Sequence, residues 1–193
     1  MLFLLNFFLV FGLRLDYEYT CRISSFVHAI LSSFFGFLYI FEFINYNILA
    51  YSIYYSIVYL LIDLYLYYTY KIDTKDIVEM TIHHSLFILI ALIAYKFPLY
   101  YSYGIICEMS TIFLNLRWFA IKKLYVKNIA LYSILLWINF LIFRILNLNY
   151  LGYSMVMSEY CLYSILLIPF LILNMMWFYS LTLDGINRYI IKN

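Results

Sequence analysis

Six long apolar stretches constrain what this chain can fold into more than any other feature. A helix of about 20 apolar residues rises roughly 30 Å, which matches the hydrocarbon core of a bilayer. Lipid offers the backbone no hydrogen-bond partner, so each stretch must satisfy its own peptide groups by forming a helix. We therefore predict an all-α, polytopic membrane helical bundle with six spans, at 24–44, 48–69, 80–96, 99–118, 128–148 and 158–183.

The composition agrees with this fold class. Of the 193 residues, 67% are hydrophobic and 11% are charged, whereas a soluble domain carries about 25% charged residues. The chain is therefore predicted to be an integral membrane protein. We expect membrane lipids as its partners and no nucleic acid.

The N-terminal segment 1–13 is apolar but short. It lacks the basic start and the small-residue cleavage site of a signal peptide. We interpret it as a short N-terminal helix that either crosses the membrane or only enters it. The predicted organisation is this helix, one transmembrane domain at 21–185 and a short tail at 186–193.

Basic residues gather on one side of the predicted spans. Nine of them lie in alternate connections and in the tail: Arg14, Arg22, Lys71, Lys75, Lys122, Lys123, Lys127, Arg188 and Lys192. The opposite connections, at 45–47, 97–98 and 149–157, carry none, with only Lys96 at the edge of one. Cytoplasmic loops carry the excess of Lys and Arg, so we predict a cytosolic C-terminus.

Several ionisable residues lie where lipid disfavours charge. Those in or at the edge of a predicted span are Asp63, His83, His84, Glu108, Arg117 and Arg144. A charged side chain at the centre of a span costs about 2.5–3.5 kcal/mol even on the insertion scale. We therefore expect these side chains to face a protein interior or a polar cavity, and to mark a functional site.

Most of these groups are predicted to lie in the cytosolic half of the bilayer. His83 and His84 stand in the first turn of their span, roughly 5 Å below the boundary, and Asp63 lies roughly 9 Å below it. His28 is in the second turn of its own span, but it is too isolated in sequence to be given a role from its position alone. The sequence therefore predicts a site that opens to the cytosol.

The adjacent pair His83 and His84 is the leading candidate for chemistry. Neighbours on a helix point about 100° apart, so one ring can face the bundle while the other packs beside it. Asp63 must be protonated or paired across helices, and a histidine is its natural partner. Asp76 and Glu79 precede His83 by seven and four residues, where they either orient the imidazole or only suit a helix N-terminus. A purely structural role for the histidines stays open.

A polar stripe runs along the fourth predicted span. Glu108, Thr111 and Asn115 fall at i, i+3 and i+7, so they share one face, where they either bind substrate or hold helices together. Arg117 points about 180° away from Glu108. It either joins the site or reaches the cytosolic headgroups.

Structural roles are predicted for Arg144 and for the cysteines. We expect Arg144 to pair with Asn139 within the bundle. Cys21, Cys107 and Cys161 are scattered without CxxC spacing, so we expect them to be buried as small apolar residues. Neither a disulfide nor a metal site is predicted.

The chain resembles the TLC-domain family (TRAM, Lag1 and CLN8) through several segments in order along the chain. These are CRISSFVHAILS (21–32), the span that contains Asp63, DIVEMTIHHS (76–85), EMSTIFLNLRWF (108–119), FLIFR (140–144) and NMMWF (174–178). The family includes ceramide synthases, in which a His pair and acidic residues serve acyl transfer from acyl-CoA to a sphingoid amine. Other members act in membrane lipid composition, lipid sensing or trafficking. Phe87 stands where the synthases often have threonine, and the segment 108–119 is more similar to the non-synthase TLCD-like branch.

The residues and the resemblance together lead to one leading prediction and one alternative. The leading one is a membrane protein of lipid metabolism or lipid homeostasis with ceramide-synthase-like acyl transfer. Acyl-CoA is then the co-substrate, no cofactor is bound, and a neutral imidazole attacks the thioester or deprotonates the amine. The candidate catalytic residues are His83, His84 and Asp63, and the candidate substrate-binding residues are Glu108, Thr111, Asn115, Arg117, His28 and Asp76. The alternative is a non-catalytic protein that binds or senses lipid.

Other classes fit less well. A seven-span transporter or receptor predicts a pocket open to the outer face, but the ionisable groups crowd the cytosolic half. A di-iron hydroxylase needs many more histidines than the 3 present. The resemblance implies the endoplasmic reticulum or another endomembrane, and a homodimer is kept open as an assembly state.

Overall fold

The structure, a computed structural model, describes residues 17–69, 74–122 and 128–189, and every regular element within these ranges is helical. Six helical stretches of 20 to 28 residues are long and apolar enough to cross a membrane. They are Glu18–Ile40, Tyr46–Thr69, Ile77–Lys96, Pro98–Ile121, Ile129–Val156 and Cys161–Ile186. The predicted helical membrane bundle with six spans is therefore confirmed. The predicted helix at 1–13 lies outside the described residues.

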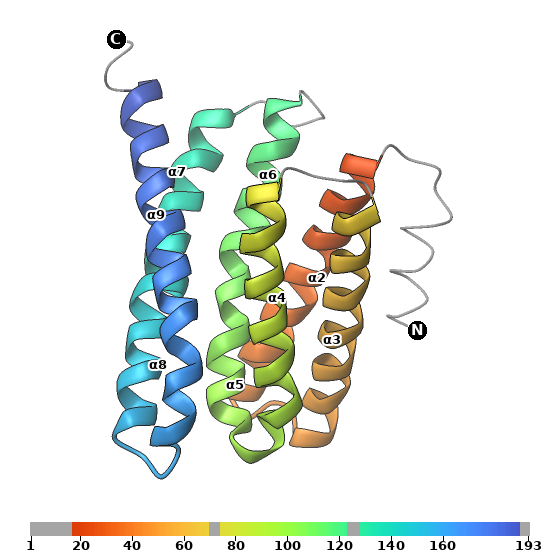
Figure 1. Ribbon diagram of the computed structural model, residues 1–193, viewed down its shortest axis with the longest axis vertical. Helices are drawn as coiled ribbons and strands as arrows, with labels where there is room; N and C mark the ends of the chain where they lie inside the picture. Colours follow the sequence, from red (N-terminus) through yellow and green to blue (C-terminus); the bar gives the residue numbers. More distant parts are fainter. Residues whose placement is uncertain (1–16, 70–73, 123–127, 190–193) are drawn as a thin grey trace. The chain divides into compact units, whose positions relative to one another are not determined.

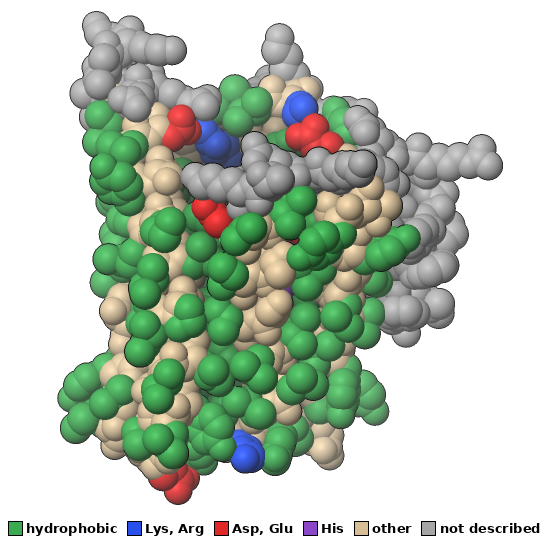
Figure 2. Space-filling model, viewed as in Figure 1, with side chains coloured by type: hydrophobic (Ala, Val, Ile, Leu, Met, Phe, Trp, Pro, Cys, Tyr) green, Lys and Arg blue, Asp and Glu red, His purple; other side chains and the backbone are tan. Residues whose placement is uncertain are grey.

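Hydrophobic side chains cover the helices along most of their length on the face drawn in Figure 2, and most of the charged side chains on this face lie toward helix ends. Many large apolar residues are more than half exposed, among them Tyr51, Leu61, Leu92 and Ile172. In water such a surface is a liability, whereas in lipid it is the expected outer surface.

The chain divides into two compact units between Ile106 and Cys107. Elements of the first unit are α2 (Tyr17–Ile40), α3 (Tyr46–Thr69), α4 (Thr74–Ile93), the 3₁₀ turn η1 (Ala94–Lys96) and α5 (Pro98–Ile105). Within this unit α2 contacts both α3 and α5, and α3 contacts α4. Figure 1 shows α2, α3 and α4 running side by side.

Helix α2 ends four residues earlier than the predicted span, at Ile40. Glu42 adopts a left-handed conformation with φ of 61°, which breaks the helix. Its N–H donates to the carbonyl of Tyr39 (3.0 Å), and the N–H of Phe43 donates to that of Leu38 (2.8 Å). These two bonds form a Schellman cap, which satisfies the last carbonyls of the helix. Apolar composition alone carries no signal for this stop.

Small residues allow α2 to approach its neighbours closely. A Cβ atom added at Gly36 would lie 2.8 Å from Ile106 Cγ2, 2.9 Å from Ile105 Cγ1 and 3.1 Å from the carbonyl oxygen of Ser102. The contact between α2 and α5 therefore needs a glycine at this position. Fully or almost fully buried small residues also lie on α2 and α3: Ala29, Ser32, Ser33, Ser52 and Ser56. Such residues are typical of helix contacts in membranes.

The second unit contains the rest of the described chain. Its elements are the end of the 3₁₀ turn η2 (Ile106–Glu108), α6 (Met109–Ile121), α7 (Ile129–Asn139), the π-helix η3 (Phe140–Leu146), α8 (Asn147–Val156), the 3₁₀ turn η4 (Cys161–Leu166) and α9 (Leu167–Tyr189). Helix α6 contacts α7 and η3, and α9 contacts α7, η3, α8 and η4. Figure 1 shows α8 and α9 as neighbours joined by a short turn.

The π-helix η3 interrupts the fifth span with seven residues of wider turn. Side chains hold its backbone, because the carbonyl of Phe143 accepts from the thiol of Cys107 (2.8 Å) and from the Asn147 amide (3.3 Å). π-helical turns are rare and are frequent at functional sites. This one places Arg144 toward α6 and α9.

Candidate functional site

Asp63 and His84 form a buried pair between α3 and α4. The Oδ2 atom of Asp63 lies 3.7 Å from Nε2 of His84, and the two side chains are 8% and 4% exposed. Both helices are neighbours in the first unit, and both residues lie inside membrane-spanning segments. The expectation that a histidine partners Asp63 across helices is confirmed.

His83 packs beside this pair. Its ring lies 5.5 Å from the ring of His84 at an angle of 50°, and 6.5 Å from the ring of Phe87. Both histidines are buried, although neighbours on a helix point about 100° apart. Two adjacent imidazoles are therefore held within the protein at one level of the membrane.

The depth of the His pair differs from the prediction. Helix α4 begins at Thr74, and its apolar span begins at Ile77, so His83 and His84 lie beyond the first turn. His84 is seven residues inside its span, roughly 10 Å, and Asp63 is six residues inside its own, roughly 9 Å. The depths of His84 and Asp63 below the membrane boundary are therefore more similar than the predicted spans indicated. The side chain of Asp76 lies outside the described residues.

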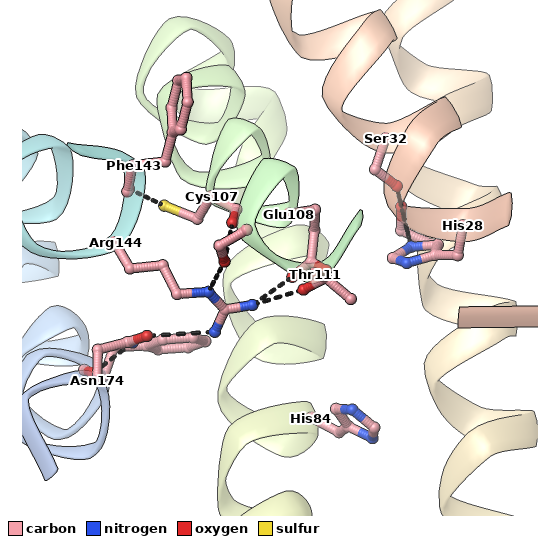
Figure 3. A network of polar contacts seen from close by, with 12 residues as sticks. His28, Ser32, His84, Cys107, Glu108, Thr111, Phe143, Arg144 and Asn174 are labelled. Carbon is pink, nitrogen blue, oxygen red and sulfur yellow. Dashed lines mark hydrogen bonds and ion pairs between the residues drawn. The ribbon is translucent and has the colours of Figure 1, made fainter. Parts of the chain in front are cut away.

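His28 belongs to a hydrogen-bonded group between α2 and α3. Its Nε2 atom lies 3.0 Å from Ser32 Oγ and 3.2 Å from Ser56 Oγ, and these two hydroxyls are 3.2 Å apart. The imidazole also stacks on the ring of Tyr59, with ring centroids 3.9 Å apart and an angle of 12°. Figure 3 shows the bond between His28 and Ser32. His28 is thus well connected in space, and one of its partners, Ser32, lies one helical turn away in the sequence.

In the second unit, Arg144 gathers a separate polar cluster. The guanidinium donates from Nε to Ser110 Oγ (2.6 Å), from Nη1 to Asn174 Oδ1 (3.2 Å) and from Nη2 to Thr111 Oγ1 (2.8 Å). Nη2 also lies 3.5 Å from Oε1 of Glu108, and both side chains are about nine-tenths buried. Figure 3 shows the guanidinium between Glu108, Thr111 and Asn174.

Aromatic rings complete the surroundings of Arg144. Its guanidinium carbon lies 5.3 Å from the ring centroid of Phe140 and 5.8 Å from that of Trp177. Rings at these distances stabilise a cation by their negative faces. The charge of Arg144 is therefore stabilised by a carboxylate, three polar side chains and two aromatic rings, all within the second unit.

The predicted pairing of Arg144 with Asn139 is wrong. The Asn139 amide donates to the carbonyl of Leu135 in the preceding turn of its own helix (2.8 Å). Arg144 instead uses partners on η2, α6 and α9. Asn139 and Arg144 share one predicted span, whereas η3 presents the arginine to three other elements.

The side chains of the predicted polar stripe make two separate kinds of contact in the structure. Thr111 accepts from Arg144 beside Glu108, while the amide of Asn115 donates to the carbonyl of Thr111 (3.0 Å). Arg117 lies on another face, as predicted, and donates to Asp184 (2.8 Å) and to Ser133 (2.9 Å). These side chains contact protein groups, and their role in binding a substrate stays a prediction.

Sequence reasoning missed several partners of the site residues. These are Ser32, Ser56 and Tyr59 around His28, and Ser110, Asn174, Phe140 and Trp177 around Arg144. Polar side chains within lipid-spanning helices were a usable signal for Asn174 and the serines. The tyrosine and the tryptophan carried none, because aromatic residues occur all along these spans.

Cysteines and possible metal ligands add little to the site. Cys107 is buried as expected, but Cys161 is exposed and Cys21 is partly exposed, so burial holds for one of the three. None of the three forms a disulfide. Among the described residues, no group of three or more His, Cys, Asp or Glu side chains could hold a metal ion.

Comparison with known proteins gives one clear result. The family model of the TLC domain (TRAM, LAG1 and CLN8) matches residues 19–183, which is most of the chain and includes all six spans almost entirely. Neither the curated proteins nor the solved structures gave a match. The match covers the Asp63–His84 pair, the His28 group and the Arg144 cluster. The chain belongs to the TLC-domain family.

Proposed function

We propose that this protein transfers an acyl group from acyl-CoA to a lipid amine in the membrane. The observation that carries the proposal is the buried contact between Asp63 and His84, 3.7 Å between Oδ2 and Nε2. A carboxylate beside an imidazole is the arrangement with which enzymes orient a histidine base and stabilise its protonated form. The family match supports a role in lipid chemistry but not a particular reaction.

In the proposed reaction, His84 acts as the general base. The amine nitrogen attacks the thioester carbonyl carbon, and His84 accepts the proton that the amine loses. The C–N bond forms as the C–S bond breaks, and the His84 imidazolium returns the proton to the departing coenzyme A thiolate. Asp63 stabilises the imidazolium during this step, and His83 packs against the reacting ring. General-base catalysis of this kind contributes about 10²–10⁴-fold in rate.

Topology favours acyl-CoA as the donor. Nine of the twelve Lys and Arg residues lie in the connections and the C-terminal tail that we assign to the cytosol. In that orientation Asp63 and His84 lie within roughly 10 Å of the cytosolic boundary, where a soluble coenzyme can deliver its thioester. We place the C-terminus in the cytosol and the protein in the endoplasmic reticulum or another endomembrane.

The test is an acyl-transfer assay on purified protein in lipid nanodiscs, with acyl-CoA and a long-chain base as substrates. We expect amide product from the wild type. His84→Ala and Asp63→Asn should each lower kcat at least 100-fold, since base and orienting carboxylate are lost. His83→Gln should lower it less, because His83 is not the ring that faces Asp63.

A matched control comes from the second unit. Asn139→Ala removes a half-buried amide that donates to the carbonyl of Leu135 in its own helix, and it should leave the rate within twofold. Equal activity of wild type and His84→Ala protein, with both folded as judged by thermal unfolding, contradicts the proposal.

The second candidate is a lipid-binding protein without turnover. The observation that favours it is that Asp63 and His84 are both buried within membrane-spanning helices, where a polar pair can hold a lipid headgroup without any reaction. Lipid that co-purifies with the wild type and is lost from the Asp63→Asn variant, with no amide formed by either, supports this alternative.

A further inference from the structure

We propose that His28 is a positioning residue: together with Ser32 and Ser56 it fixes the rotation of α3 against α2, and this sets where Asp63 meets His84. The inference rests on the proposed function only in taking Asp63 and His84 as the reacting pair. The geometry that carries it lies entirely within the first unit.

The three side chains form a closed triangle between two helices. His28 and Ser32 lie one turn apart on α2, and Ser56 faces them from α3. All three sides of the triangle measure 3.0–3.2 Å, so one serine hydroxyl can bond the ring nitrogen while the two hydroxyls bond each other. The residues are 3%, 0% and 0% exposed, so water does not compete for these bonds.

This triangle is linked to Asp63 through one face of α3. Ser56, Tyr59 and Asp63 fall at i, i+3 and i+7, and all three are buried. The His28 ring stacks on Tyr59 at 3.9 Å, one turn before Asp63. A contact that holds Ser56 and Tyr59 toward α2 therefore also determines the direction in which Asp63 points.

The rotation of α3 needs a polar determinant because its apolar residues surround the helix. Tyr55 and Tyr59 are buried, while Tyr51, Tyr54, Tyr65 and Tyr68 are exposed, so similar side chains occur on both faces. In lipid there is little hydrophobic gain in burying one apolar face rather than another. Interhelical hydrogen bonds and close packing of small residues must then select the orientation.

On the other side, α3 is linked to α4 by the Asp63–His84 pair itself and by one hydrogen bond near the helix end. Tyr68 Oη lies 3.0 Å from Thr81 Oγ1, but this bond is exposed near the end of the helix. The triangle is buried and lies closer to the middle of the span. It is therefore a stronger restraint on the rotation of α3 than this exposed bond.

The same burial argues against a direct chemical role for this group. A serine nucleophile needs space for a substrate beside its Oγ atom, and both Ser32 and Ser56 are 0% exposed. The contacts of His28 Nε2 are hydroxyls, whereas the carboxylate of the first unit's buried pair contacts His84. His28 is therefore assigned to positioning, not to catalysis.

The test uses the fact that the chain has 3 histidines. Protein labelled with ¹⁵N-histidine in nanodiscs gives a spectrum of three imidazoles, and His83→Gln and His28→Phe identify the signals of the two removed rings. We expect the double variant Ser32→Ala/Ser56→Ala to shift the imidazole resonances of His84, because Asp63 moves relative to its ring. His28→Phe, which keeps a stacked ring and loses both hydrogen bonds, should shift them in the same direction.

The matched control is Ser33→Ala/Ser52→Ala. These serines lie next to or one turn from the triangle on the same two helices and are equally buried, and their hydroxyls have no hydrogen-bond partner among the described residues. The control should leave the His84 resonances at their wild-type positions. Unchanged His84 signals in both test variants, or an equal shift in the control, overturn the proposal.

Acyl-transfer assays on the same variants separate this inference from the proposed function. A loss of kcat in the triangle variants that parallels the His84 shift supports both. A His84 shift in a protein that has no acyl-transfer activity even as wild type supports positioning and contradicts the proposed reaction. Acyl-transfer activity of the wild type, combined with unchanged His84 signals in the triangle variants, supports the proposed reaction and contradicts the positioning role.

Discussion

Arg144 is a charged residue about 94% buried in a span that crosses the membrane, and Glu108 is the carboxylate beside it. Neither charge is tolerable alone in a medium of low dielectric constant. Breaking a buried ion pair by removing one partner costs about 3–5 kcal/mol, because the other charge is left uncompensated. The hydroxyls and rings around Arg144 reduce this cost but do not cancel its charge.

We therefore expect Glu108→Gln and Arg144→Gln each to destabilise the protein by about 3 kcal/mol. The double variant should be more stable than the sum of the two losses predicts, because it leaves no unmatched charge. A double-mutant cycle from unfolding in detergent measures this coupling. Strictly additive losses would mean that the two side chains do not interact.

At the residue scale, the Asp63–His84 contact was predictable because a buried carboxylate must have a partner and few were available. The surroundings of His28 and Arg144 were not predictable from the sequence. Most of their partners come from other helices, and the rotation of each helix about its axis is not encoded in a nearly uniform apolar sequence. The error over Asn139 arose in this way.

At the scale of elements, the contact between α2 and α5 depends on a glycine. In Gly36→Ala the new methyl group meets two isoleucine side chains below 3.0 Å and a backbone carbonyl at 3.1 Å. We expect a loss of about 1–3 kcal/mol in unfolding free energy, as for overpacked cores. Thermal unfolding in detergent measures it.

Gly104→Ala is the matched control for this substitution. Gly104 also lies in a helix of the same unit, but a Cβ atom there has no other heavy atom within 4 Å. Alanine is the better helix former by about 1 kcal/mol, so this variant should be as stable as the wild type or more so. Equal destabilisation by both substitutions would refute the close approach at Gly36.

The number of spans and their approximate positions were predictable, because length and apolar character are properties of the sequence itself. The ends of the helices were less predictable than the spans themselves. The stop after Ile40 depends on Glu42 in a left-handed conformation, and α4 begins at Thr74, before its apolar residues. The cap after Ile40 is formed by local backbone hydrogen bonds, which a search for apolar runs does not detect.

At the scale of the whole molecule, the distribution of basic residues predicts how the chain is inserted. Cys161 begins the sixth span, directly after a connection that is predicted to lie on the side opposite the basic residues, and it is exposed. In sealed microsomes, whose cytosolic face is outside, a membrane-impermeant maleimide should modify Cys161 only after the membrane is permeabilised.

The labelling is measured in a Cys21→Ser/Cys107→Ser background, where serine can still donate the hydrogen bond that Cys107 makes to Phe143. A further Cys161→Ser substitution removes the signal and serves as the control. Full labelling in intact microsomes reverses the predicted orientation, and with it the assignment of Asp63 and His84 to the cytosolic half.

The wide turn of η3 affects how this span can be aligned with other sequences. Its i→i+5 hydrogen bonds take about one residue more per turn than those of an α-helix. A helical wheel continued from α7 through Phe140–Leu146 therefore assigns the residues of α8 to the wrong faces. Relatives that lack this extra residue would require a gap inside an apparently continuous transmembrane helix, and alignments scored on hydropathy alone would misplace Arg144.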